Sequence, residues 1–94
     1  MEVGYSAKAM EDIAYWKKSG NKKIQQKIAA LIFSIEETPF LGIGSPEALK
    51  HNLAKLWSRR INQEHRLMYE VSKDTVIIHP LLGHYNQEIK LNFE

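Results

Sequence analysis

A basic segment in the middle of the 94-residue sequence carries the side-chain types that bind phosphate. Between positions 50 and 66 a single acid, Glu64, stands among five cations and two imidazoles: Lys50, His51, Lys55, Arg59, Arg60, His65 and Arg66. Guanidinium groups bind phosphate oxygens through paired hydrogen bonds. The net charge of +2 is too small to indicate a polyanion partner by itself. The indication of phosphate binding therefore comes from this local clustering of basic residues. A solvated strand face is the alternative interpretation.

Other kinds of chemistry find little support in the composition. The sequence contains no cysteine, which removes disulfides, thiolate catalysis and the usual structural zinc sites. His51, His65 and His79 follow no metal-ligand spacing, and we expect neither a metal nor a cofactor. The length allows one domain, residues 1–94. No signal-like apolar segment and no run of 18 apolar residues occurs, so we expect a cytoplasmic protein outside the membrane.

Hydrophobic periodicity predicts two helices after a short strand at residues 1–5. Ser6 can cap a first helix that Gly20 ends, and Asn21 can cap a second that closes near Thr38. Apolar residues recur every three to four positions in both: Ala9, Ile13 and Trp16, then Ile24, Ile28, Leu31 and Ile35. Residues 40–47, FLGIGSPE, fit neither period and are predicted to form a connecting loop.

The second half is rich in strand formers, with runs near residues 50–53, 56–62, 65–72 and 75–82. Short links between the runs indicate antiparallel neighbours. In the third run, alternation separates an apolar face with Leu67, Tyr69 and Val71 from a mixed face with Arg66, Met68 and Glu70. The helical hairpin needs an apolar face to cover, so Arg66 is expected in an open concavity on the other side. The predicted fold class is α+β, a helical hairpin on a twisted antiparallel sheet.

Several of these motifs together resemble a known family. The run PEALKHNLAKLWSRRINQEHRLMYEV, the later GHY, the AYW of the first helix and the loop TPFLGIGSPE are similar to the YoeB toxins of the RelE superfamily. The resemblance implies a RelE-like, microbial-ribonuclease-like fold. It also implies the toxin of a toxin–antitoxin pair: a metal-independent endoribonuclease that cuts mRNA at the ribosomal A site, is neutralised by a YefM-type antitoxin and forms a homodimer.

The same resemblance assigns roles by position. Glu47 corresponds to the general base of the PExLKHN motif, Arg66 to the arginine of EHRLxY, and His84 and Tyr85 to the closing His-Tyr pair. RNA contact is implied for the basic residues of the two central motifs: Lys50, His51, Arg59 and Arg60.

RNA chemistry accounts for these residue types, because the 2′-OH of RNA is its own nucleophile. A base must remove its proton, and an acid must protonate the departing 5′-oxygen, work that Glu47 and His84 can divide. Arg66 can stabilise the charge that develops on the phosphate oxygens. The product would be a 2′,3′-cyclic phosphate. Tyr85 could stack on a base or hold the phosphate.

Each residue also has an ordinary structural interpretation. Glu47 alone would be a surface carboxylate or helix cap, and His84 and Tyr85 alone would be an exposed histidine and a partly buried aromatic. Arg66 could pair with Glu64 or Glu70 on the surface.

Two features depart from the family pattern: the stretch with Pro80 and Leu82, which indicates an edge or bulge with weaker RNA contact, and a possible extension at residues 86–94.

Two other functions were weighed. A non-catalytic module could use the same basic sheet to bind RNA or protein, but it would be expected to have lost part of the set Glu47, Arg66, His84 and Tyr85. A DNA-binding repressor fits poorly, because neither predicted helix has a basic recognition face. For an antitoxin, the simplest site is the concavity holding Glu47, Arg66 and His84.

Overall fold

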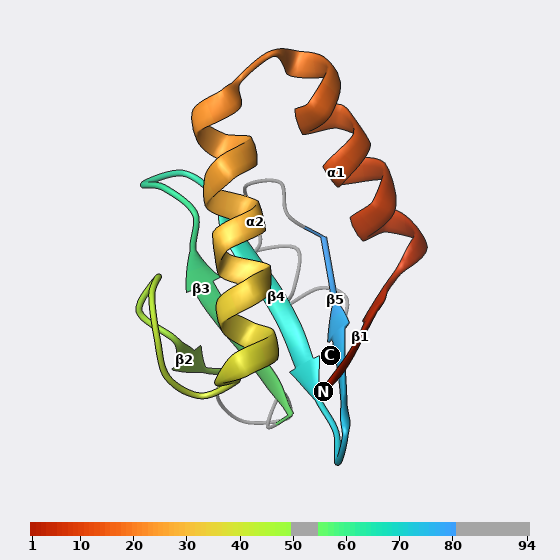
Figure 1. The fold of residues 1–94 in the computed structure, drawn as a ribbon, viewed down its shortest axis with the longest axis vertical. Helices are drawn as coiled ribbons and strands as arrows, with labels where there is room; N and C mark the ends of the chain where they lie inside the picture. The colour runs from red at the N-terminus through yellow and green to blue at the C-terminus, as the bar shows by residue number, and fades with distance from the viewer. Residues whose placement is uncertain (50–54, 81–94) are drawn as a thin grey trace.

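The computed structural model describes residues 1–49 and 55–80, and these form one layer of two helices on one sheet. The strands are β1 (Glu2–Tyr5), β2 (Glu47–Ala48), β3 (Leu56–Arg60), β4 (Arg66–Val71) and β5 (Thr75–Ile78). They lie in the order β1-β5-β4-β3-β2. In Figure 1, helix α1 (Ala7–Ser19) lies above β1, and helix α2 (Lys22–Glu37) crosses in front of β3 and β4. The predicted α+β class is confirmed.

The helix ends follow the predicted capping residues. The Ser6 hydroxyl accepts from the backbone N–H of Ala9 at 3.1 Å, and the Asn21 side chain accepts from that of Ile24 at 3.1 Å. Gly20 separates the helices with a φ of 78°, in the left-handed region that glycine adopts without a steric penalty. These local signals produce the helical hairpin.

The sheet is mixed, which corrects the prediction of an antiparallel sheet. Pairs β2–β3, β3–β4 and β4–β5 are antiparallel, whereas β1 runs parallel to β5, with Glu2 opposite Thr75. Strand β1 is the first element of the chain and is connected to the other strands through the two helices. No tight turn joins β1 to β5, so nothing forces the two strands to run antiparallel. Short connections require antiparallel pairing only between strands that follow each other in the sequence.

The core lies between the helices and one face of the sheet. It joins residues from every layer: Ala9, Trp16, Ile28, Leu31, Ile35, Ile61, Leu67, Tyr69, Val76 and Ile78. The predicted assignment of Leu67 and Tyr69 to the helix side is confirmed, and Val71 packs against the same cluster. No helix within the described residues is long and apolar enough to cross a membrane.

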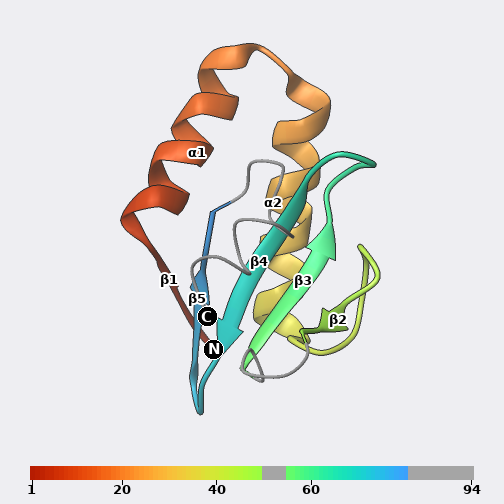
Figure 2. The same cartoon turned by 180° about the vertical axis from the view of Figure 1, so that it is seen from behind.

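The other face of the sheet, here called the far face, is turned away from both helices, as Figure 2 shows from behind. Its middle holds a second small cluster in which Leu56 and Met68 are buried and Leu49 packs against them. Apolar side chains therefore fill the centre of this face, and Arg66 lies half-buried on the same face. The predicted strand at 50–53 lies outside the described residues. The structure shows a strand just before it, β2 at Glu47–Ala48.

Candidate active site

Glu47 and Arg66, which are 19 positions apart, meet at a third residue on the far face. Glu47 pairs with Ser58 across β2 and β3, so both side chains leave the sheet on the same side. The Arg66 guanidinium donates from Nη1 to the Ser58 hydroxyl oxygen at 3.1 Å. Glu47 is exposed and Arg66 is half-buried. The Glu47 carboxylate on the edge strand β2 and the anchored Arg66 guanidinium on the central strand β4 thus lie on the same face of the sheet, with Ser58 between them.

A second arginine extends this cationic surface. Arg60 lies directly opposite Arg66 in the β3–β4 register, and its side chain is exposed. Neither acid considered as a surface partner is at ion-pair distance from Arg66 in the described parts of the chain. Glu64 lies 4.0 Å from the His65 ring, and Glu70 lies 3.4 Å from that of His79. The guanidinium of Arg66 therefore keeps donors available for an anion.

Arg59 is not placed to contact RNA, which corrects its predicted role. Its side chain points to the helix side and is fully buried. Nη1 donates to the Ser34 hydroxyl at 2.6 Å and to the Ile43 carbonyl at 3.2 Å, while Nη2 donates to the carbonyls of Thr38 at 2.6 Å and Leu41 at 2.8 Å. Three of these bonds fix loop 38–46 against the sheet, and the one to Ser34 ties Arg59 to α2. Arg59 is therefore a structural cation that holds the segment leading to Glu47.

Tyr69 completes the anchor from the neighbouring strand. Its hydroxyl accepts from Arg59 Nε at 3.1 Å and donates to the Pro39 carbonyl at 2.7 Å. Burial raises the pKa of the Tyr69 hydroxyl above its ordinary value of 10.0, although the hydrogen bond and positive charge of Arg59 oppose part of that rise. The neutral hydroxyl is the form that can donate to Pro39.

Two glycines let the loop approach the anchor closely. Gly42 and Gly44 have φ values of 122° and 83°. A Cβ at Gly44 would lie 2.6 Å from Leu31 Cδ2, and one at Gly42 would meet the Ser34 hydroxyl. The Gly44 carbonyl also accepts from the backbone N–H of Arg60 at 2.7 Å. The FLGIGSPE loop thus packs tightly and delivers Glu47 to the sheet edge as β2.

The predicted basic segment divides between the two sides of the molecule. Arg59 faces the helices, and the His65 ring packs edge-on against Trp16 with centroids 5.2 Å apart. Arg60 and Arg66 belong to the far face. Alternation along a strand already requires adjacent Arg59 and Arg60 to point to opposite faces. That signal was available in the sequence and would have removed one of the two from the RNA surface.

The structure leaves four predicted site residues untested. Lys50, His51, His84 and Tyr85 lie outside the described residues, as does the possible extension at 86–94. Ser58, in contrast, was missed by sequence reasoning although it connects Glu47 to Arg66. Its serine type has no distinctive spacing, and only the strand register identifies it. Within residues 1–49 and 55–80, no group of three or more His, Asp or Glu side chains could hold a metal.

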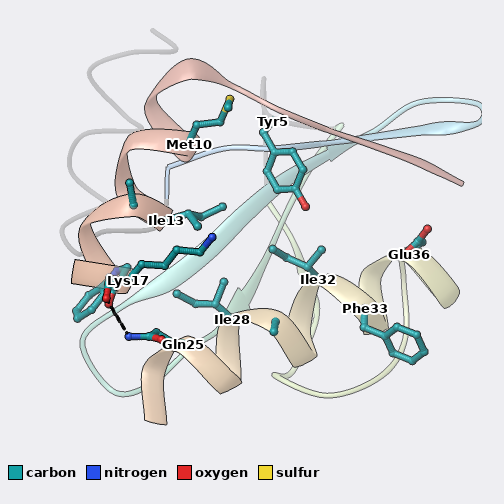
Figure 3. Close-up of a pocket in the computed structure, with 12 residues that line it drawn as sticks. Tyr5, Met10, Ile13, Lys17, Gln25, Ile28, Ile32, Phe33 and Glu36 are labelled. Atoms are coloured by element: carbon teal, nitrogen blue, oxygen red, sulfur yellow. Dashed lines mark hydrogen bonds between the residues drawn. The ribbon is translucent and has the colours of Figure 1, made fainter. Parts of the chain in front are cut away.

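A separate groove of about 770 Å³ runs between the helices, away from the far face. Figure 3 shows Ile13, Ile28 and Ile32 lining it, with Lys17 and Glu36 toward its ends. Gln25 bridges the helices there by donating to the Trp16 carbonyl at 2.9 Å. The lining is predominantly apolar and holds no cluster of arginine, histidine and carboxylate. The groove therefore does not compete with the far face as a site for phosphate chemistry.

Comparisons with known proteins agree with this architecture. Residues 5–85 match the family described as the YoeB-like toxin of bacterial type II toxin-antitoxin system. Toxin YoeB of Escherichia coli (strain K12) is 45% identical over 85 residues, covering 90% of this chain and 100% of that toxin.

Two solved structures from Staphylococcus aureus, a YoeB-YefM complex and a YoeB dimer, are similar as well. They are 42% and 41% identical, with TM-scores of 0.79 and 0.80, and each match covers 90% of this chain and 98% of the solved chain. Two helices on a mixed five-stranded sheet are thus the fold of RelE-like toxins. The chain belongs to the family of YoeB-like toxins of bacterial type II toxin–antitoxin systems.

Proposed function

We propose that this toxin is a ribosome-dependent mRNA endoribonuclease that cleaves RNA by attack of the 2′-OH. The observation that carries the proposal is the meeting of Glu47 and Arg66 at Ser58. This arrangement puts the Glu47 carboxylate, a potential proton acceptor, and the Arg66 cation on the same surface. A surface ion pair, the alternative interpretation of Arg66, does not account for its hydrogen bond to the buried hydroxyl of Ser58.

In the proposed reaction, the Glu47 carboxylate removes the proton from the 2′-OH, and the 2′-oxygen attacks phosphorus. Ser58 occupies one N–H of Arg66, so the remaining guanidinium donors can bind the phosphate oxygens as negative charge develops. The resemblance to the family supplies His84 as the acid for the 5′-oxygen and Tyr85 as a contact to phosphate or base. The products are a 2′,3′-cyclic phosphate and a 5′-hydroxyl end.

The exposure of Glu47 supports the proposed dependence on the ribosome. Glu47 is exposed on the edge strand β2. An exposed carboxylate acts best on a strand that is already held in position, and the ribosome would hold the mRNA in this way. Arg60 on the far face, together with the expected contacts Lys50 and His51, would add affinity for phosphates. The proposed site of action is the cytoplasm.

The proposed partners are a YefM-type antitoxin and a second copy of the chain. Similar proteins from Staphylococcus aureus have been solved as a YoeB-YefM complex and as a YoeB dimer. An acidic antitoxin segment laid over Glu47, Arg60 and Arg66 would neutralise the cations and block access to the carboxylate. Neutralisation would then be competitive with mRNA.

The test is induced expression of the parent and of Glu47→Ala, Arg66→Ala and His84→Ala, with mRNA 5′-ends mapped in each culture. We expect growth arrest and new 5′-ends with the parent, and loss of both with the first two variants. Growth arrest without new ends would instead identify a binding module. Unchanged cleavage by Glu47→Ala and Arg66→Ala would contradict the assigned roles.

A further inference from the structure

A second titratable pair lies on the far face, at the strand next to Arg66. The His79 ring nitrogen Nε2 lies 3.4 Å from the Glu70 carboxylate oxygen Oε1, within hydrogen-bonding range. Both side chains are partly exposed, with 22% and 38% of their side-chain area accessible. A carboxylate that holds one ring nitrogen of a histidine fixes the direction of the ring and leaves the other nitrogen for a substrate.

The strand register places His79 in line with the candidate active site. Its backbone N–H donates to the Met68 carbonyl at 2.8 Å, which continues the β4–β5 pairing by one residue. Met68 lies opposite Ser58, and Ser58 lies opposite Glu47. One row across the far face therefore reads Glu47, Ser58, Met68, His79. Three strand spacings separate the backbones at its ends, about 14 Å.

The row carries a carboxylate at one end and an imidazole at the other, with the buried Ser58 and Met68 between them, so a phosphate held by both ends would lie above these two side chains. The attacking 2′-oxygen and the leaving 5′-oxygen lie on opposite sides of phosphorus, so base and acid must approach from opposite directions. Glu47 stands at one end of the row and His79 at the other. Between them, Ser58 anchors the guanidinium of Arg66, which can hold the phosphate oxygens.

We propose that His79 is a second catalytic imidazole of this ribonuclease site and that Glu70 positions it. This inference rests on the proposed function. As the bond between phosphorus and the 5′-oxygen breaks, the Nδ1–H of the imidazolium gives its proton to that oxygen, while Glu47 holds the proton taken from the 2′-OH. The ring becomes neutral and is recharged from solvent. Acid catalysis in this chain then does not depend on His84 alone.

The test is single-turnover cleavage of ribosome-bound mRNA by the purified full-length chain and its variants. We expect His79→Ala to slow cleavage by about 100-fold, the lower end of the range for general acid catalysis. Added imidazole should restore part of the rate to His79→Gly, because a small diffusible acid can occupy the vacated space. Lys73→Ala, an exposed change in the turn between β4 and β5, should cleave like the parent and gain nothing from imidazole.

The positioning role of Glu70 has its own readout. Glu70→Gln should lower kcat with little change in KM, since it disturbs ring orientation and not RNA binding. Glu64→Gln, at a carboxylate with 85% of its side chain exposed, should change neither. Melting temperatures identify any variant whose loss reflects unfolding.

Cleavage by the parent together with an unchanged rate for His79→Ala, or with no imidazole rescue, would overturn the role of His79 alone. Absence of cleavage by the parent would overturn the proposed function and this inference with it.

Discussion

Arg59 donates from Nε to the hydroxyl of Tyr69 at 3.1 Å, and this buried pair joins β3 and β4 to the loop that carries Glu47. Four further hydrogen bonds from Arg59 and one from Tyr69 end on residues 34–43. The pair lies on the helix side of the sheet, whereas Glu47 and Arg66 lie on the far face. The buried hydrogen bonds that stabilise the fold and the candidate catalytic residues thus lie on opposite faces of the sheet.

Removal of the Arg59 cation should unfold much of the population. Arg59→Met would leave the carbonyls of Thr38, Leu41 and Ile43 buried without their donor, and we expect a loss of about 3–5 kcal/mol in the free energy of unfolding. Denaturant unfolding measures it. The neighbouring Arg60→Met, at an exposed side chain, should change stability by less than about 0.5 kcal/mol. Equal effects of the two substitutions would refute the anchor.

Tyr69 should make stability fall at alkaline pH. Its pKa is raised in the folded protein relative to about 10 in the unfolded chain, so the hydroxyl stabilises the fold fully below pH 10. That contribution is lost as pH rises through the raised folded-state pKa. Tyr69→Phe should cost about 1–3 kcal/mol at neutral pH.

The difference between parent and Tyr69→Phe should then narrow above pH 10, measured by urea unfolding at several pH values. The exposed Tyr15→Phe is the control. A difference that stays constant from pH 8 to beyond pH 10 would contradict the raised pKa.

A side chain at Gly44 should lower the free energy of unfolding because of steric overlap, in addition to the cost of its backbone angle. Gly20 and Gly44 have similar φ values of 78° and 83°, but a Cβ at Gly20 meets nothing within 4 Å, whereas one at Gly44 lies 2.6 Å from Leu31 Cδ2. Gly20→Ala should therefore cost about 1–2 kcal/mol, the price of the left-handed conformation alone. Gly44→Ala should cost about 1–3 kcal/mol more. Thermal unfolding of both variants measures the difference, and equal costs would refute the tight packing of the loop.

Ser58 should affect cleavage more than stability. Ser58→Ala removes the oxygen that holds Arg66 Nη1 and leaves the backbone pairing with Glu47 in place. We expect cleavage of ribosome-bound mRNA to slow by about tenfold, because a misdirected guanidinium binds the transition state less well. The exposed Ser72→Ala should cleave at the parent rate. A Ser58→Ala rate equal to that of the parent would show that Arg66 needs no anchor.

Local signals in the sequence predict the helical part of the fold well. Ser6, Gly20 and Asn21 mark the helix ends because capping is decided by residues within one turn. The parallel pairing of β1 with β5 was not predictable in the same way, since it joins residues more than 70 positions apart and no turn connects them. The position of β2 was also missed, because a two-residue edge strand shows no periodicity.

The candidate site was predicted unevenly for related reasons. Glu47 and Arg66 were identified through the family motifs, and the structure places each of them next to Ser58 on the far face. Arg59 was misassigned because a charged residue in a basic run was read as exposed, whereas five hydrogen bonds compensate its burial. Burial of a cation depends on carbonyls of a distant loop, and nothing in the local sequence of β3 indicates that those carbonyls will be present.

The central claim is that the RNA supplies the nucleophile while Glu47 and Arg66 assist its attack. The most direct measurement uses a ribosome-bound mRNA in which the nucleotide 5′ to the cleaved bond carries 2′-deoxyribose. We expect a 2′,3′-cyclic phosphate from the all-ribose mRNA and no cleavage at the position that carries 2′-deoxyribose. Cleavage of the 2′-deoxy substrate at the same bond would contradict it, because another nucleophile would then be attacking the phosphate.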